Sequence, residues 1–239
     1  MTNKLYYFRG RGTSQQARWA LTAANIPFES VYMSSPEEFD ALKQSGKLTY
    51  GQVPMLEDDE SGRCISQSLT IVRHAARLGK LYGVTFDEAT RIDEILDGIK
   101  DARGAIVAFP FSDAHKTCQR HMNAVARYFP CFEAIVERNI AGTAPSNGVF
   151  AVGASLTIAD VLLAELVDST IEMLQATHDN DERVASSFLH PYPRLRALHA
   201  QVLALPTIKS FKASPNWMSF PAGRVGREYV TNVNTVMRR

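Results

Sequence analysis

The stretch that decides the fold runs from Gln52 to Ala76 and reads QVPMLEDDESGRCISQSLTIVRHAA. Two short apolar segments, 53–57 and 63–65, flank the acidic sequence DDESG, whose last glycine favours a hairpin turn. A helical pattern follows over 66–78, and Gly79 favours its end. The stretch therefore predicts two short strands followed by a helix.

The first turn of this helix is a candidate anion-binding site. Its backbone N–H groups have no partner within the helix, and the helix dipole adds partial positive charge. A carboxylate placed there would gain about 0.3–2 kcal/mol from the dipole alone. Ser68 could donate a further hydrogen bond, and Gln67 could reach an ammonium or amide group nearby. The alternative is N-capping of the helix by Ser66 or Ser68.

Pro54 indicates a bend at the start of the first of these strands. Proline lacks the N–H that a central strand needs, and a bond that precedes proline can be cis. If the Val53–Pro54 bond is cis, the backbone of Val53 turns outward and can pair with a peptide as an added strand would. An edge-strand proline without a ligand is the alternative. With the helix start nearby, the stretch predicts a site for a small anionic peptide.

The first third of the chain alternates between strand and helix patterns. The aromatic run 4–8 suits a buried strand, residues 14–25 place apolar side chains on one helical face, and 28–33 reads as a second strand. A short helix is predicted over 36–43. Strand, helix and strand in this order favour parallel pairing of the two strands.

Helical patterns dominate the rest of the chain. Apolar residues recur three and four apart in four predicted helices, around 92–106, 122–129, 156–174 and 192–205. We therefore expect an α/β domain over 1–82, an all-α domain over 83–213 and an ordered C-terminal tail without clear periodicity over 214–239. The segment 179–190 resembles an insertion, and residues 157–160 have the pattern of a capping box that starts a core helix.

The composition excludes several classes of protein. The 239 residues carry a formal net charge of +1, so no broad field favours nucleic acid or an anionic membrane surface. No apolar run is long enough to span a membrane, and the N-terminus lacks the apolar core of a signal peptide. Three cysteines without C-x-x-C spacing and six histidines without metal-ligand spacing predict a cytoplasmic protein with no metal site.

Several short motifs, in this order and spacing, resemble those of the cytosolic glutathione transferases. They are Y-F-R-G-R-G from Tyr7, V-P-M-L, Q-S-L-T-I-V-R-H and L-T-I-A-D. The resemblance covers roughly residues 4 to 210 and points to the sigma-like branch, which includes glutathione-dependent prostaglandin D synthases. It implies a thioredoxin-like N-terminal domain, an all-helical C-terminal domain, a homodimer, and glutathione as co-substrate.

The resemblance makes Tyr7 the residue that activates the glutathione thiol. A thiol of pKa about 8.5 is only about 3% thiolate at pH 7, and the thiolate is the nucleophile. A phenolic O–H stabilises the anion, and lowering the pKa by about 2 units requires about 2.7 kcal/mol. Ser14 is the alternative donor, because some branches of the family use a serine there. Tyr6 would point to the opposite face of the strand.

The resemblance also assigns the remaining glutathione contacts. The contacting residues that it implies are Phe39, Lys43, Gln52, Val53, Gln67, Ser68 and, from the partner subunit, Asp101, with Asp97 as the alternative to Asp101. Phe39 stands where the family often has tryptophan, and Thr13 where the sigma branch often has arginine. Arg11 could replace that missing charge or face solvent. The electrophile pocket is expected near Thr13, Arg103 and Val107, with Trp217 and Phe220 of the tail.

The predicted function is conjugation of glutathione to a small apolar electrophile. One alternative keeps the fold but isomerises a prostaglandin endoperoxide or reduces hydroperoxides. Another is a non-catalytic, crystallin-like or ligand-binding relative, against which the presence of Tyr7, Gln67 and Ser68 argues.

Overall fold

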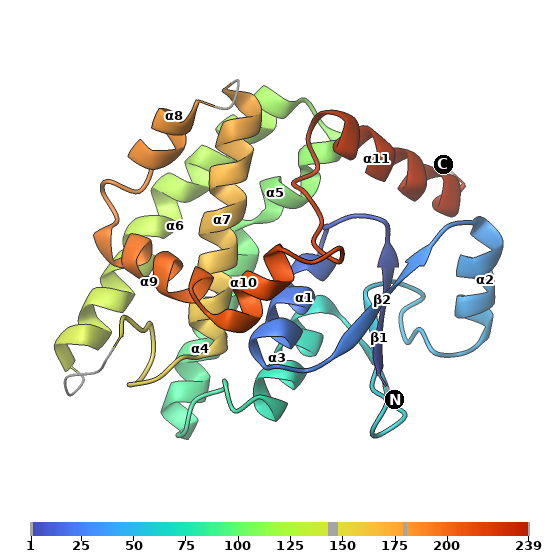
Figure 1. Ribbon diagram of the computed structural model, residues 1–239, viewed down its shortest axis with the longest axis horizontal. Coiled ribbons are helices and arrows are strands. Elements are labelled where there is room, and N and C mark those ends of the chain that lie inside the picture. Colours follow the sequence, from blue (N-terminus) through green and yellow to red (C-terminus); the bar gives the residue numbers. More distant parts are fainter. Residues whose placement is uncertain (1, 143–147, 179–180, 239) are drawn as a thin grey trace.

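The computed structural model describes residues 2–142, 148–178 and 181–238, and it has an α/β lobe beside a helical lobe (Figure 1). The elements of the α/β lobe are β1 (Asn3–Phe8), α1 (Ser14–Ala23), β2 (Phe28–Met33), α2 (Pro36–Gln44), β3 (Met55–Glu57), β4 (Cys64–Ser66) and α3 (Ser68–Leu78). The predicted order of an α/β domain followed by an all-α domain is confirmed.

Strand β1 lies in the interior of a four-stranded sheet of order β2–β1–β3–β4. It pairs in parallel with β2, as predicted, and antiparallel with β3, which in turn pairs antiparallel with β4. Side chains alternate along the strand, so Tyr7 and Tyr6 face opposite sides. The hydroxyl of Tyr6 donates a hydrogen bond of 2.8 Å to Glu57. Of the two tyrosines, only Tyr7 therefore points to the side of the sheet where α1 begins.

Helices α1 and α3 pack together and connect the sheet to the helical lobe. Small residues, Ala17 and Ala20, and the indole of Trp19 are fully buried along α1. Helix α1 also packs against α7 of the helical lobe. Thr13 is the N-cap residue of α1. The packing therefore carries the N-terminal end of α1, just after the Gly10–Gly12 turn, to the border between the two lobes.

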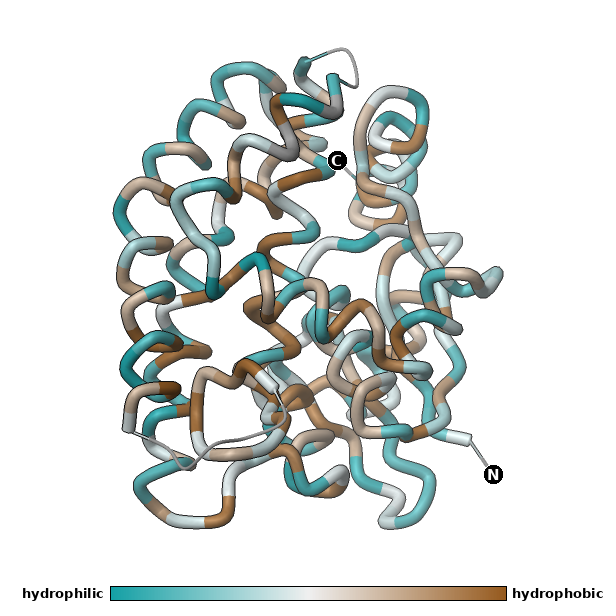
Figure 2. The backbone as a smooth tube through the Cα atoms, turned by 60° about the vertical axis from the view of Figure 1, so that its left-hand side comes forward, coloured by the Kyte–Doolittle hydropathy of each residue, from teal (hydrophilic) through white to brown (hydrophobic). Residues whose placement is uncertain are grey.

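The helical lobe is built around α7. Its elements are α4 (Phe86–Ala102), α5 (Gly104–Ala108), a 3₁₀ turn (Phe109–Phe111), α6 (Ala114–Gly142), α7 (Ile158–Thr177), α8 (Glu182–Ser187), α9 (Pro193–Leu203) and α10 (Pro206–Lys212). Every residue from Ile158 to Thr170 is buried, which is typical of a helix enclosed on all sides. Apolar positions gather in the interior of this lobe (Figure 2). None of the described helices is long and apolar enough to cross a membrane.

The predicted capping box at the start of α7 is confirmed. The Thr157 N–H and hydroxyl donate to one carboxylate oxygen of Asp160, at 2.7 and 2.9 Å, and the Ala151 N–H donates to the other at 2.6 Å. Asp160 is completely buried. The carboxylate therefore ties the preceding loop to the first turn of the core helix.

The helix predicted over 92–106 is interrupted at Arg103, which ends α4 and starts α5. The Arg103 guanidinium is buried and forms an ion pair of 3.0 Å with Glu165 of α7. A buried charge needs a charged or hydrogen-bonding partner. The break thus coincides with a buried ion pair that the periodicity of the sequence does not reveal.

The structure corrects the expectation of a tail without periodicity. Helix α11 (Gly223–Met237) ends the described chain, and its buried residues Gly226, Tyr229, Val233 and Val236 are spaced three and four apart. The spacing was therefore visible in the sequence. Helix α11 packs on the α/β lobe beside α2 and also contacts the 3₁₀ turn Phe109–Phe111 of the helical lobe (Figure 1).

The segment 179–190, expected to be an insertion, is partly described. Residues 179–180 lie outside the described residues. Glu182–Ser187 form α8, and Phe188 and Leu189 are buried in the main core. The second half of this segment is therefore part of the domain.

Candidate functional site

A cavity of about 170 Å³ brings together the two ends of the stretch 52–76. Its lining residues are Thr13, Tyr50, Gln52, Val53, Pro54, Ser66, Gln67 and Ser68. Four of these, Gln52, Val53, Gln67 and Ser68, are predicted glutathione contacts. Strands β3 and β4 pair antiparallel, so the residues just before β3 and those at the end of β4 lie together beside this cavity.

The backbone at this cavity departs from regular structure at two points. The Val53–Pro54 peptide bond is cis, which is the condition under which the Val53 backbone is expected to pair with a peptide. Gln67 has φ of +73°, a conformation that costs a non-glycine residue on the order of 1–3 kcal/mol and is concentrated at functional sites. Gln67, a predicted glutathione contact, therefore has a backbone conformation that costs free energy.

Simple capping does not explain the serines at the start of α3. Gln67 is the N-cap residue of α3 and makes no side-chain capping bond, so the alternative of N-capping by Ser66 or Ser68 is wrong. The Ser66 hydroxyl oxygen is buried and has no hydrogen-bond partner among the described residues. A buried polar group without a partner is unusual in proteins. The residues around this cavity thus include one buried hydroxyl, that of Ser66, that no described residue satisfies.

The Tyr7 hydroxyl lies at the N-terminal end of α1. The Thr13 N–H donates to its oxygen at 3.2 Å, and the Thr13 hydroxyl oxygen lies 3.3 Å away. Tyr7 is only 6% exposed. The phenol therefore lies beside Thr13, which also lines the cavity at the start of α3.

Sequence reasoning missed Tyr229, which contacts Tyr7 from α11. Its hydroxyl donates to the Tyr7 oxygen at 3.4 Å, across 222 positions of sequence. A side chain at Gly10 would clash with the Tyr229 ring, and one at Gly12 would clash with both hydroxyls. The three-and-four spacing of buried residues in α11 could have indicated a helix there. It could not have indicated that this helix packs over Tyr7.

The alternatives to Tyr7 and Thr13 are engaged elsewhere. The Ser14 hydroxyl is buried and donates to the Arg11 carbonyl oxygen at 2.8 Å. The Arg11 guanidinium forms an ion pair with Glu172 and donates to the Met218 carbonyl oxygen at 2.6 Å. The expectation that Arg11 faces solvent or replaces the missing cation of the site is therefore wrong, because α7 and the segment before α11 surround it.

A second cavity, of about 440 Å³, lies where the two lobes meet. The predicted electrophile residues Thr13, Arg103 and Val107 all line it, together with Gln67 and Ser68 from the first cavity. Trp217 and Phe220 are not among its lining residues. Trp217 instead packs near the Arg11 guanidinium, whose central carbon lies 4.7 Å from the ring centre, and Phe220 packs 5.1 Å from the Phe109 ring centre. Thr13 and the start of α3 thus border both cavities.

Tyr7 and three further predicted glutathione contacts are not among the lining residues of these cavities. Phe39 is buried in a small core with Val236 of α11, which explains why an aromatic residue suits this position. The Lys43 ammonium lies 3.2 Å from Asp40 and 4.2 Å from the Phe39 ring centre. Asp101 is exposed on α4 and makes no hydrogen bond or ion pair with the described residues.

Two family models match this arrangement over most of the chain. They describe the glutathione S-transferase N-terminal domain, over residues 1–77, and the C-terminal domain, over residues 100–215. The chain is 32% identical to glutathione S-transferase alpha-4 of Rattus norvegicus, over 98% of its own length and 97% of that protein's. This chain belongs to the glutathione S-transferase family. The expected glutathione transferase fold, with a thioredoxin-like N-terminal domain, is thereby confirmed.

Other relatives of this glutathione S-transferase span more than one branch. Glutathione S-transferase 3 of Gallus gallus is 33% identical over 98% of this chain and 94% of that protein. The solved prostaglandin synthase D of Nilaparvata lugens has a TM-score of 0.65 at 26% identity, covering 90% of this chain and 98% of that one. The monomeric Na-GST-3 of Necator americanus has a TM-score of 0.72 at 24% identity, covering 92% and 100%, which supports the fold alone. The relatives establish the family without placing the chain in the sigma-like branch.

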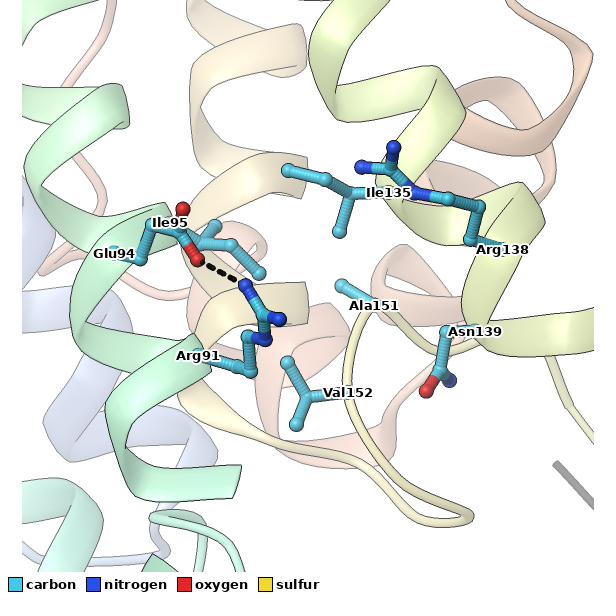
Figure 3. Close-up of a pocket in the computed structure, with 8 residues that line it drawn as sticks. All are labelled: Arg91, Glu94, Ile95, Ile135, Arg138, Asn139, Ala151 and Val152. Carbon is cyan, nitrogen blue, oxygen red and sulfur yellow. Dashed lines mark hydrogen bonds and ion pairs between the residues drawn. The ribbon is translucent and has the colours of Figure 1, made fainter. Parts of the chain in front are cut away.

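A cavity of about 530 Å³, larger than either of the two just described, lies away from them. It is formed between α4, α6 and the loop that carries Ala151 and Val152 (Figure 3). The Arg91 guanidinium bonds to Glu94 at 2.8 Å on one side of it. None of the predicted site residues lines this cavity, so size alone does not locate the site.

Proposed function

We propose that this protein conjugates glutathione to a small apolar electrophile, with the Tyr7 hydroxyl stabilising the thiolate. The observation that carries the proposal is the position of Thr13. It contacts the Tyr7 hydroxyl and lines both the cavity of the predicted glutathione residues and the cavity of the predicted electrophile residues. A sulfur beside Tyr7 would therefore lie where the two substrates meet.

Two parts of glutathione have matching groups in the first cavity. The γ-glutamyl carboxylate suits the first turn of α3, where free N–H groups and the helix dipole favour an anion, and Ser68 adds a hydroxyl donor. The cysteinyl backbone suits the outward-facing main chain of Val53, as an added strand would. Binding these two parts would place the thiol near Tyr7, and this proximity supplies a large part of the rate.

The simplest test is the reaction itself. The purified protein should be retained on immobilised glutathione and should conjugate an activated aryl halide at a rate that saturates with glutathione. Retention without any turnover over a panel of aryl halides, enals and hydroperoxides would instead support the non-catalytic alternative.

A second candidate function is isomerisation of a prostaglandin endoperoxide, with the chain in the sigma-like branch. The structural likeness to the prostaglandin synthase D of Nilaparvata lugens favours it. The same thiolate would then attack an endoperoxide oxygen as the O–O bond breaks, and the other oxygen would take up a proton. Loss of a proton from the carbon that bears the S–O group would then break the S–O bond, leave a ketone and release the thiolate. Product analysis distinguishes the two functions, because an isomerase returns glutathione unchanged whereas a conjugating enzyme consumes it.

We further propose that the protein acts as a homodimer in which Asp101 reaches the ligand of the partner subunit. Asp101 is exposed and has no polar partner in the described part of its own chain, whereas Asp97 bonds to Arg73 at 3.3 Å. Replacing Asp101 with Asn should raise KM for glutathione about fivefold, as expected for the loss of about 1 kcal/mol of binding, with kcat nearly unchanged.

Asp97→Asn is the matched control for this prediction. It removes a carboxylate one turn earlier on the same helix and should leave KM within twofold. If Asp97→Asn gives the larger rise, the alternative assignment is correct. Sedimentation of the wild-type protein should give twice the mass of one chain, and a monomer with normal KM would contradict the role of Asp101 across an interface.

A further inference from the structure

The contact between Tyr229 and Tyr7 joins α11 to the reacting end of the site. Tyr229 is 4% exposed, and the Tyr7 oxygen is the only hydrogen-bond partner of its hydroxyl among the described residues. Both rings belong to one small buried cluster with Val233. Buried polar groups are normally hydrogen-bonded, and Tyr229 meets this need through its bond to the Tyr7 oxygen.

The direction of this hydrogen bond follows from the surroundings of Tyr229. Burial raises the pKa of Tyr229, and its contact with Tyr7 acts in the same direction, while the nearby Arg18 guanidinium acts against both. The other charged side chains at the small cavity beside it are Arg11, Arg103 and Glu165, and each is held in an ion pair. Tyr229 therefore stays protonated, and its hydroxyl donates a hydrogen bond to the Tyr7 oxygen.

The Tyr7 oxygen consequently has two fixed donors. The Thr13 N–H can only donate, and it points to this oxygen at 3.2 Å. With the Tyr229 hydroxyl, it occupies both acceptor positions of a phenolic oxygen. The proton of Tyr7 itself then has one remaining neighbour, the Thr13 hydroxyl oxygen at 3.3 Å, until a sulfur is bound nearby.

We propose that Tyr229 is a positioning residue of the reaction: by donating to the Tyr7 oxygen it directs the Tyr7 proton to the glutathione sulfur and strengthens that bond. This inference rests on the proposed role of Tyr7. A hydrogen bond that an oxygen accepts polarises the one it donates, so the two act cooperatively. Helix α11 is thus part of the thiol-activating apparatus as well as a cover over it.

Contacts along α11 hold Tyr229 in place. The Asn232 side chain accepts from the Arg9 N–H at 2.8 Å and donates to the Met33 carbonyl oxygen at 2.9 Å. Near the helix end, Arg238 forms an ion pair of 2.8 Å with Asp40. The Phe111 ring packs against the Tyr229 ring at a centroid distance of 5.5 Å. The contacts of Asn232 and Arg238 fasten the helix to the α/β lobe, and that of Phe111 joins it to the helical lobe, so its position does not depend on the Tyr229 hydroxyl.

The test is Tyr229→Phe, which removes the hydroxyl and keeps the ring. We expect kcat to fall about threefold and the pKa of the bound thiol to rise by about half a unit, the size expected for one weak neutral hydrogen bond. KM for glutathione should stay within twofold. The pKa is read from the ultraviolet absorbance of the bound thiolate against pH and from the pH profile of kcat/KM.

Three variants separate this role from packing. Tyr192→Phe, which removes a phenolic hydroxyl far from the site, should leave the pH profile unchanged. Val233→Ala weakens the packing of α11 without touching the hydroxyl, and a shift as large as that of Tyr229→Phe would overturn the proposal. In a Tyr7→Phe background, Tyr229→Phe should have no further effect on the thiol pKa, because the oxygen it acts on is gone.

The outcomes also separate this inference from the proposed function. If Tyr7→Phe leaves turnover and thiolate absorbance unchanged, the proposed function fails and this inference fails with it. If Tyr7→Phe removes the thiolate signal while Tyr229→Phe leaves the pH profile where it was, this inference alone is wrong.

Discussion

Replacing Tyr7 with Phe should lower kcat/KM for conjugation of an activated aryl halide by about 10²-fold, the usual effect of removing one donor to a developing anion. The substitution keeps the ring in its buried cluster and removes only the hydroxyl. The pKa of the bound thiol should rise towards its value in solution, so the activity of the variant should recover partly as pH increases. Initial rates between about pH 6 and about pH 9 would measure both effects.

Two controls make the result specific to Tyr7. Tyr6→Phe removes a hydroxyl from the adjacent residue of β1, where it bonds to Glu57 on the other face, and it should leave the rate unchanged. Ser14→Ala removes the alternative donor, whose hydroxyl is engaged with the Arg11 carbonyl. A loss of rate in Ser14→Ala with none in Tyr7→Phe would show that the serine activates the thiol.

Replacing Asp160 with Ala should lower the free energy of unfolding by about 3 kcal/mol or more. The substitution leaves the buried N–H groups of Ala151 and Thr157 without partners, and each such loss costs about 1–3 kcal/mol. It also opens space at the start of the core helix α7. Urea unfolding at neutral pH, followed by far-ultraviolet circular dichroism, would measure the change.

Asp113→Ala is the matched control for this loss. The Asp113 carboxylate caps the start of α6 by accepting from the Lys116 N–H at 2.9 Å, but it is exposed. Its removal should cost about 1 kcal/mol, as for an ordinary cap. Equal losses of unfolding free energy in the two variants would mean that burial does not strengthen the contribution of the Asp160 bonds.

Local sequence patterns were sufficient to predict most of the fold. The strand, helix and strand over 4–33 follow from apolar periodicity, and the two short strands and the helix after Pro54 follow from the turn sequence between them and the helical pattern beyond. The capping box of α7 is equally local, since its partners are three residues apart. These features depend on residues near one another in the chain, and elementary rules of turns, caps and periodicity describe such neighbours.

Local sequence patterns were not sufficient to predict which residues pair with the buried polar groups. Nothing near Arg11 in sequence indicates Glu172, 161 positions away, and nothing near Tyr7 indicates Tyr229. The sequence by itself determined that a tyrosine stands at the end of a strand, before a glycine-rich turn and a helix. Only the tertiary structure decided what surrounds that tyrosine, because the packing of α11 and α7 against the first lobe brings distant side chains together, and such packing depends on the shape of the whole core.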